Sequence, residues 1–312
     1  MYYIIIMPII FSTCWYLFKA KFDPTVFQTW IHNMLSNVNN YYLVIYTDDN
    51  SISFITPYES NPRIKIIKKP MEEFYNYKYR EQWIQNHMIN HSLKEKVDWR
   101  VNMLWSEKIH FVKQTINEGY FIDTIKDQDT IKEQDTIKEQ DTIKEQDTIK
   151  EHDTIKEQDT IKHGWCDIGY FRGRKYDMNM DELKMWPNND KINALSNTKI
   201  HYGCVNNNTH YVNHIFNLVN NKNANGLPIQ ELPPDLNTIG GGFFILHRSM
   251  IEWWRTLYDN TLEKYFKNGY LVKDDQTIIA DCIFSNLPYF LLHNEEHNEK
   301  YDIWFPFQRL LI

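Results

Sequence analysis

One carboxylate, Asp167, lies inside the otherwise apolar run HGWCDIGYFR at residues 163–172. We expect a short buried strand over residues 165–168 that ends at Gly169 in an aromatic and basic turn. A buried ionised carboxylate is costly unless it is paired, hydrogen-bonded or bound to a metal. An aspartate that accepts backbone N–H groups at a strand end is the ordinary explanation. The nearby aromatic residues, glycine and Arg172 favour a strand tip where a metal and an anionic group meet.

Two glycines, Gly241 and Gly242, mark a second place suited to a ligand. Residues 239–247, IGGGFFILH, predict a strand that begins with glycines. Because glycine has no side chain, the backbone at Gly241 and Gly242 can come close to a bound molecule. A β-bulge is the alternative explanation.

Two adjacent carboxylates form a third candidate group. Asp274, Asp275 and Gln276 precede a helix predicted over residues 277–284, and the helix dipole favours negative charge at that end. The carboxylates either cap this helix or act as a base or as ligands of a substrate hydroxyl.

Three more polar side chains are candidates for contacting a nucleotide, a phosphate or a metal. Asp48 follows a strand predicted over residues 41–46, and open α/β sheets bind ligands at the carboxyl ends of their strands. An ordinary Asp/Asn turn explains Asp48 equally well. Lys108, on a helix predicted over residues 98–116, either reaches a phosphate or is solvated. His293 is a candidate metal or phosphate contact near the end of the chain.

The predicted strands and helices that would position these residues indicate a single α/β domain over residues 1–312. A helix begins near Asp23-Pro24, as cap and first residue, and the Asn-rich segment 206–238 is expected to be a long loop or lid. Predicted strands cover residues 3–11, 41–46, 63–68 (nearer an edge), 165–168, 199–205 and 239–247, and residues 12–22 are expected to form a loop.

Composition excludes some classes of protein. Of 312 residues, 42% are hydrophobic and 15% aromatic, which is typical of a globular chain rather than a disordered one. The net charge of −7 includes no stripe of Lys and Arg long enough to bind nucleic acid. The four cysteines form no CxxC pair, which favours a reducing compartment, the cytoplasm. Residues 1–18 are uncharged, but Pro8 interrupts them and no basic region precedes them, so we expect a buried strand rather than a membrane anchor.

A tandem hexapeptide, DTIKEQ and close variants, occupies residues 123–162. Its seven lysines, eight aspartates and five glutamates give a net charge of −6, so the rest of the chain carries about −1. Isoleucine recurs every six residues, which places it on three different sides of an α-helix and forms no apolar stripe. We expect a solvated insertion, helical in part or disordered, in a surface loop beside Asp167.

The order of these elements resembles the GT-A glycosyltransferases, and short stretches look like the HtrL/YibB family of glycosyltransferase-like proteins. The resemblance spans nearly the whole chain outside 123–162, and its specific part is WCDIGYFR. The stretches are LVIYTD at residues 43–48, LWSEK at 104–108, WCDIGYFR at 165–172 and GGFF at 241–244. The resemblance implies a Rossmann-type mixed sheet flanked by helices.

The resemblance also implies roles for individual residues. GT-A enzymes hold a divalent metal on the donor diphosphate with a D-x-D motif, and Asp167 falls where its last acid would be. Cys166 replaces an acid there, which puts metal dependence in doubt. An acid after a GG-containing strand often serves as the acceptor base in inverting members, which points to Asp274 or Asp275.

Together these features predict a nucleotide-sugar-dependent glycosyltransferase with a glycan, lipid or protein acceptor. Mg²⁺ or Mn²⁺ would neutralise the leaving diphosphate from Asp167, with Lys108, Arg172 and His293 adding positive charge. The other donor contacts would be Asp48 on the nucleotide, Gly241 and Gly242 on the sugar, and Gln276. The lone acid in place of D-x-D leaves open a second hypothesis, a catalytically silent module that binds a nucleotide or glycan. A structural protein that uses the repeat as its contact surface is the third.

Overall fold

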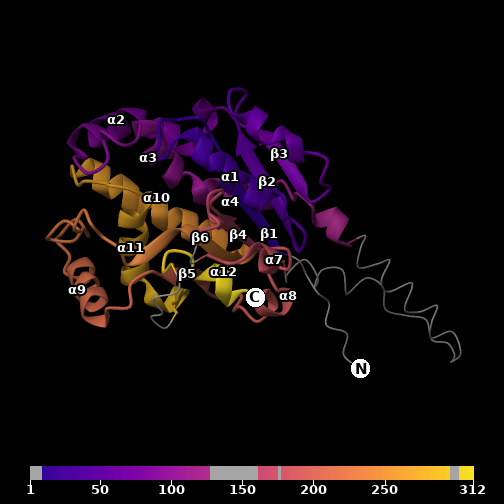
Figure 1. Ribbon diagram of the computed structural model, residues 1–312. Helices are drawn as coiled ribbons and strands as arrows, with labels where there is room; N and C mark the ends of the chain where they lie inside the picture. The colour runs from indigo at the N-terminus through magenta and orange to yellow at the C-terminus, as the bar shows by residue number, and fades with distance from the viewer. Residues whose placement is uncertain (1–8, 127–160, 175–176, 296–301) are drawn as a thin grey trace, which may run out of the picture.

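A computed structural model describes residues 9–126, 161–174, 177–295 and 302–312 (Figure 1). The chain forms an α/β fold around a seven-stranded mixed sheet, whose strand order is β3-β2-β1-β4-β6-β5-β7. The strands are β1 (Ile9–Trp15), β2 (Tyr41–Thr47), β3 (Ile64–Lys68), β4 (Lys162–Cys166), β5 (Ile200–Cys204), β6 (Ile239–His247) and β7 (Phe290–His293). Strands β3, β2, β1 and β4 are mutually parallel, whereas β6 is antiparallel to β4 and to β5.

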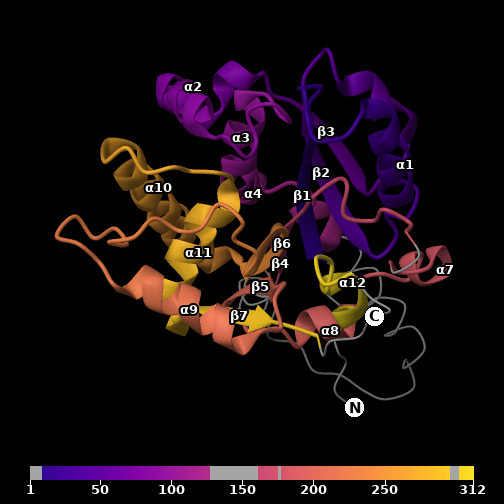
Figure 2. The ribbon, with the colours of Figure 1, turned by 60° about the vertical axis from the view of Figure 1, so that its left-hand side comes forward.

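The sheet separates two apolar clusters, because successive side chains of a strand point to opposite faces. In β2, Tyr42, Val44 and Tyr46 pack on one face, and Tyr41 and Leu43 on the other. The first face is covered by α4 (Lys108–Asn117), α9 (Thr209–Asn220), α10 (Ile251–Lys267) and α11 (Asp275–Ser285). The second is covered by α1 (Pro24–Leu35), α7 (Met180–Leu183), α8 (Asn189–Asn193) and α12 (Phe307–Leu310). Figure 2 shows α10 and α11 on one side of the sheet and α1 on the other.

The α-helices are α1 (Pro24–Leu35), α2 (Arg80–Ile89), α3 (Trp99–Ser106), α4 (Lys108–Asn117), α7 (Met180–Leu183), α8 (Asn189–Asn193), α9 (Thr209–Asn220), α10 (Ile251–Lys267), α11 (Asp275–Ser285) and α12 (Phe307–Leu310). Short 3₁₀ helices cover Ile52–Phe54, Thr56–Tyr58, Met71–Glu73, Tyr75–Tyr79, Arg248–Met250 and Leu287–Tyr289. The predicted start of α1 is confirmed, since Asp23 caps it through the backbone N–H of Thr25 and Pro24 is its first residue. Strand β3 lies at the edge of the sheet, as its alternating charge predicted.

The predicted loop over residues 12–22 is wrong at its start, because β1 continues to Trp15. Ser12 and Thr13 pair with β2 in the parallel ladder. The Ser12 hydroxyl is satisfied inside the core by the Thr115 hydroxyl, 2.7 Å away. Ser12 therefore continues the strand with its hydroxyl paired, whereas the Thr13 hydroxyl is buried without a hydrogen-bond partner among the described residues. Of the strand predicted over residues 3–11, residues 3–8 lie outside the described residues.

The helix predicted over residues 98–116 is two helices that meet at Glu107. Its carboxylate accepts the backbone N–H groups of Tyr75 and Asn76, at 2.7 and 3.0 Å. These bonds hold a buried acid at the junction between α3 and α4, so that Lys108 becomes the first residue of α4. The Lys108 side chain is buried, with 7% of it exposed.

Two further predictions are corrected by the fold. The segment 206–238 is not a continuous loop, because α9 begins at an Asn208 cap and buries Ile215 and Val219. Residues 127–160 of the hexapeptide insertion lie outside the described residues. Its two ends are not solvated, since Ile125 and Ile161 are buried in the first apolar cluster. Within the described residues, no helix combines the length and apolar character needed to cross a membrane.

Candidate functional site

A cavity of about 760 Å³ opens where β1 and β4 end and β6 begins. It is lined from one side by the segment after β1 and from the other by the start of α11. Eight of the ten residues singled out from the sequence line this one cavity: Lys108, Asp167, Arg172, Gly241, Gly242, Asp274, Asp275 and Gln276. The carboxyl ends of parallel strands are a common ligand site in open α/β sheets.

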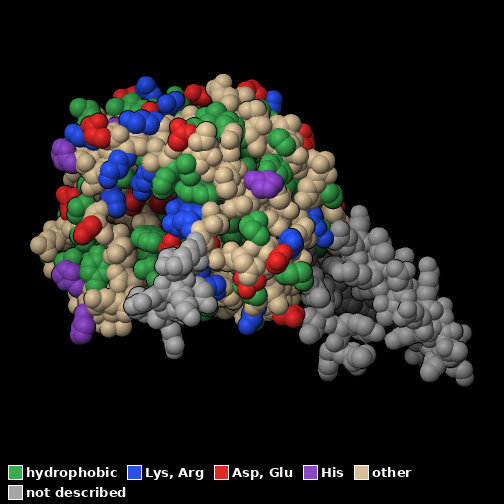
Figure 3. Space-filling view, viewed as in Figure 1, with side chains coloured by type: hydrophobic (Ala, Val, Ile, Leu, Met, Phe, Trp, Pro, Cys, Tyr) green, Lys and Arg blue, Asp and Glu red, His purple; other side chains and the backbone are tan. Residues whose placement is uncertain are grey.

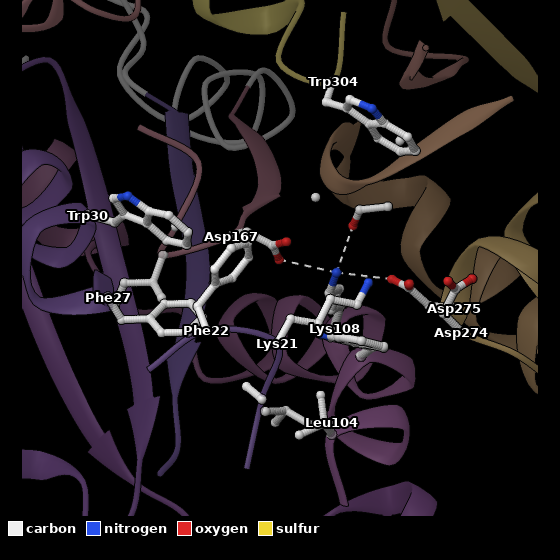
Figure 4. Close-up of a pocket in the computed structure, with 18 of the residues that line it drawn as sticks. Lys21, Phe22, Phe27, Trp30, Leu104, Lys108, Asp167, Asp274, Asp275 and Trp304 are labelled. Carbon is white, nitrogen blue, oxygen red and sulfur yellow. Dashed lines mark hydrogen bonds and ion pairs between the residues drawn. The ribbon is translucent and has the colours of Figure 1, made fainter. Parts of the chain in front are cut away.

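The Lys108 ammonium, part of the cavity lining, lies between two carboxylates (Figure 4). Its Nζ is 3.1 Å from Oδ1 of Asp167 and 3.0 Å from Oδ2 of Asp275. It also donates a hydrogen bond to the backbone carbonyl of Gly241, at 2.8 Å. Three segments distant in the sequence therefore meet on one side chain of α4.

Lys108 is held charged by this arrangement. Only 7% of its side chain is exposed, and burial alone would lower its pKa. The carboxylates of Asp167 and Asp275 outweigh burial and raise the pKa of Lys108 above its usual value. Removing one partner of a buried ion pair typically costs about 3–5 kcal/mol, because the other charge is left uncompensated. The network is thus a strong local constraint on the cavity.

Asp275 is the most buried carboxylate of this network, with 7% of its side chain exposed. Its pKa is raised to about 6, chiefly by burial, with Lys108 opposing the rise and Asp274 adding to it. Gly241 is required beside it, since a Cβ on Gly241 would lie 2.7 Å from Oδ2 of Asp275. Asp274 makes no side-chain capping bond to α11 and pairs with Lys273 at 3.2 Å.

Asp167 follows β4 directly and extends its pairing with β6, because its N–H donates to the Gly242 carbonyl at 2.8 Å. The indole N–H of Trp165 donates to Oδ1 of Asp167 at 2.6 Å. With 39% of its side chain exposed, Asp167 is accessible from the cavity. The predicted strand over residues 165–168 is shifted, because β4 spans Lys162–Cys166 and Asp167 lies just beyond its end.

An aromatic and basic wall faces this network. The Arg172 guanidinium lies 4.4 Å from the ring centroid of Trp30 and 4.8 Å from that of Phe305. Its Nε donates to the Gly169 carbonyl at 3.1 Å, and burial is the main reason that its pKa is lowered. Lys21 lies over the Trp105 ring at 5.1 Å. Among the ion pairs of the described residues, none joins Arg172 or Lys21 to a carboxylate.

Charged side chains gather on this side of the molecule. On the face shown in Figure 3, Lys and Arg side chains surround a hollow that contains acidic ones. Besides Arg172 and Lys21, the cavity lining includes Arg174, which is paired with Asp302. The two cations without a carboxylate partner are the ones available to an anionic ligand.

Two of the residues predicted for the site lie elsewhere. Asp48 is not in the cavity lining, because its carboxylate accepts the Ser51 N–H at 2.9 Å and closes the turn after β2. His293 lies on β7, where its Nε2 is 2.9 Å from Nδ1 of His201. Burial, together with His201, lowers the pKa of His293 to about 4. Neither residue contacts the Lys108 network.

The residues around Asp167 do not fit a divalent metal site. Within the described parts of the chain, no group of three His, Cys, Asp or Glu side chains could hold a metal ion. Cys166, in place of the first acid of D-x-D, is fully buried in the second apolar cluster. Oδ1 of Asp167 is already occupied by Trp165 and Lys108. The four cysteines are all free.

Comparison with protein-family models finds no match for this chain, and neither does comparison with curated proteins.

Several cavity residues escaped the sequence analysis, chiefly aromatic ones. They are Trp15, Phe22, Phe27, Trp30, Trp105, Trp304 and Phe305, together with Lys21 and Arg174. Figure 4 shows Phe22, Phe27 and Trp30 on the Asp167 side of the cavity. For Trp15, Phe22, Phe27 and Trp30, the available signal was the density of aromatic residues on both sides of the Asp23-Pro24 helix start.

Proposed function

We propose that this chain is a nucleotide-sugar-dependent glycosyltransferase of the GT-A kind, with a glycan, lipid or protein as acceptor. The observation that carries the proposal is the Lys108 network. It brings Asp167 and Asp275 to one cavity at the carboxyl ends of β1 and β4. The similarity of WCDIGYFR to the HtrL/YibB proteins supports the same assignment.

The charge and shape of the cavity suit a nucleotide diphosphate-sugar. Arg172 and Lys21 would neutralise the diphosphate, since charge-assisted hydrogen bonds to phosphate are strong and arginine binds it in bidentate fashion. The half-buried ring of Phe27 offers a flat face for a base or a sugar ring, and the buried Trp30 packs edge to face against it. Gly241 and Gly242 would let the backbone approach the sugar.

In an inverting transfer, the acceptor oxygen bonds to the anomeric carbon while the bond from that carbon to the diphosphate breaks. The diphosphate leaves with the bonding electrons, and a carboxylate takes the hydroxyl proton. We assign the proton to Asp275, because a pKa of about 6 is well matched to a base that works near neutral pH. Asp274, its neighbour at the start of α11, and Gln276 would contact the acceptor or the sugar.

The test is release of nucleoside diphosphate from UDP-, GDP- and dTDP-sugars, and of CMP from a CMP-sugar, with mixed glycan acceptors. We expect one donor to be consumed and Asp275→Asn to abolish consumption. Asp48→Asn is the matched control, because Asp48 lies outside the cavity and asparagine can keep its bond to Ser51. Equal turnover by wild type and Asp275→Asn would refute the assignment of the base.

A second candidate function is a catalytically silent module that binds a nucleotide or glycan. It is favoured by the pairing of both carboxylates with Lys108 and by the low exposure of Asp275, 7%. Binding of one nucleotide-sugar without its consumption under any acceptor would decide for this candidate.

A further inference from the structure

The cavity already contains a cation of its own at the place where a metal would bridge two acids. We propose that the Lys108 ammonium takes the place of a divalent metal ion, so that the cavity binds its diphosphate ligand without one. This inference rests on the proposed function for the identity of the ligand, but the role of Lys108 is tested separately below.

The surroundings of Lys108 Nζ are those of a hard cation. Its three neighbours are all oxygens, from Asp167, Asp275 and the Gly241 carbonyl, at 3.1, 3.0 and 2.8 Å. Carboxylate and carbonyl oxygens are also the ligands of Mg²⁺ and Ca²⁺, at about 2.0–2.6 Å. The longer distances here suit an ammonium, which binds oxygen through N–H groups at about 2.7–2.9 Å or somewhat more.

Lys108 cannot readily leave this position. Only 7% of its side chain is exposed. Its backbone is fixed at the first turn of α4, directly after the Glu107 junction, where the Glu107 carboxylate accepts two backbone N–H groups. Its ammonium donates one hydrogen bond, to the Gly241 carbonyl, and forms ion pairs with Asp167 and Asp275, so three oxygens surround its three N–H groups.

The remaining ligand set is too poor for a metal beside Lys108. Cys166 is buried in the second apolar cluster and is not among the residues that line the cavity. The second carboxylate oxygen of Asp167, Oδ2, lies beside Gly242, where a Cβ would be 3.1 Å from it. Among the described residues, no group of three His, Cys, Asp or Glu side chains surrounds it as a metal would require. A monovalent ammonium leaves the two carboxylates with a net charge of −1. The diphosphate must therefore be neutralised by Arg172 and Lys21.

The experiment is calorimetric titration with MnCl₂ alone, on the full chain without nucleotide. We expect wild type to show no saturable site that depends on Asp167, and Lys108→Met to gain one Mn²⁺ site. That site should disappear in Lys108→Met combined with Asp167→Asn. Lys113→Met is the matched control on the same helix, since Lys113 pairs with Glu252 at the surface and should gain nothing.

A saturable Mn²⁺ site in wild type that Asp167→Asn removes would overturn the proposal, and so would failure of folded Lys108→Met to gain a site. If wild type binds Mn²⁺ and Asp167→Asn binds it equally well, the ion is bound elsewhere in the chain, and this outcome supports the proposal. If Lys108→Met does not fold, the wild-type titration decides alone. For the nucleotide that binds, affinity in EDTA should equal that in Mn²⁺, and a tenfold gain with Mn²⁺ would contradict the inference. A chain that binds no nucleotide refutes the proposed function and leaves the Mn²⁺ titration valid.

Discussion

Asp167 and Asp275 share a single counter-ion, the Lys108 ammonium, at 3.1 and 3.0 Å. One carboxylate follows a central strand of the sheet and the other begins a helix more than a hundred residues later. They differ in access, because 39% of the Asp167 side chain is exposed and only 7% of that of Asp275. This difference separates their roles. Both line the cavity, but Asp167 is the more exposed to a ligand, whereas Asp275 is a buried acid whose pKa is set by its surroundings.

The stability of the protein should depend on pH through Asp275. Its pKa is raised from 3.8 to about 6, chiefly by burial, so the folded chain holds this proton more tightly than the unfolded chain. The proton on Asp275 therefore stabilises the folded chain. This stabilisation is fully present below about pH 4 and is lost as pH rises through 6. We expect its loss to remove roughly 3 kcal/mol from the free energy of unfolding across that range. Urea denaturation from pH 4 to 7 should show that the free energy of unfolding depends less on pH in Asp275→Asn than in wild type. An equal dependence on pH in both proteins would refute this.

Much of the fold follows from local sequence, but the centre of the site does not. The buried run before Asp167 and the glycines of β6 are local patterns, and both lead to the cavity. The break at Glu107, directly before the buried Lys108, is stabilised by backbone groups of Tyr75 and Asn76 about thirty residues earlier. Helical periodicity carries no record of such a distant contact, so it predicts one continuous helix there.

The misplaced candidates fail for a related reason. An aspartate after a strand is equally able to bind a ligand or to close a turn, and Asp48 does the second by accepting the Ser51 N–H. The pairing of His293 with His201 requires β7 to lie beside β5, which the sequence alone does not reveal. A local turn therefore explains the misplaced Asp48, and long-range strand pairing explains the misplaced His293.

Asp167→Asn should abolish donor turnover while leaving the fold intact. The amide still accepts the Trp165 N–H, but it loses the charge that pairs with Lys108. We expect a loss of at least about a hundredfold, comparable with loss of other electrostatic groups at active sites. Far-ultraviolet circular dichroism checks the fold. Full activity with an unchanged spectrum would contradict a role for Asp167.

Gly241→Ala should disturb the network more than Gly240→Ala. The new methyl group at position 241 would lie 2.7 Å from Oδ2 of Asp275, a buried charged atom with little room to move. At position 240 the nearest atom is a Val205 methyl carbon at 3.1 Å, which can yield. Overpacking typically costs about 1–3 kcal/mol. Denaturation of both variants measures this, and equal stabilities would contradict the packing argument.

Arg172→Ala should weaken binding of the nucleoside diphosphate. Loss of charge-assisted hydrogen bonds of about 1.5–3 kcal/mol corresponds to a rise in Kd of about 10- to 100-fold. Arg80→Ala is the control, because Arg80 pairs with Glu81 on the exposed surface of α2. Calorimetric titration with the preferred nucleotide compares them. Equal weakening by both substitutions would exclude a specific contact.

The most direct test of the account is a thermal-shift screen of wild type against UDP-, GDP-, CMP- and dTDP-sugars in the presence of EDTA. A ligand at a hundred times its Kd adds about 2.7 kcal/mol to the free energy of unfolding, which is easily detected as a rise in Tm. We predict that one nucleotide class raises Tm, that Arg172→Ala reduces the rise, and that Asp48→Asn retains it. If no nucleotide-sugar raises Tm, with or without Mn²⁺, the cavity is not a donor site and the proposed function is wrong.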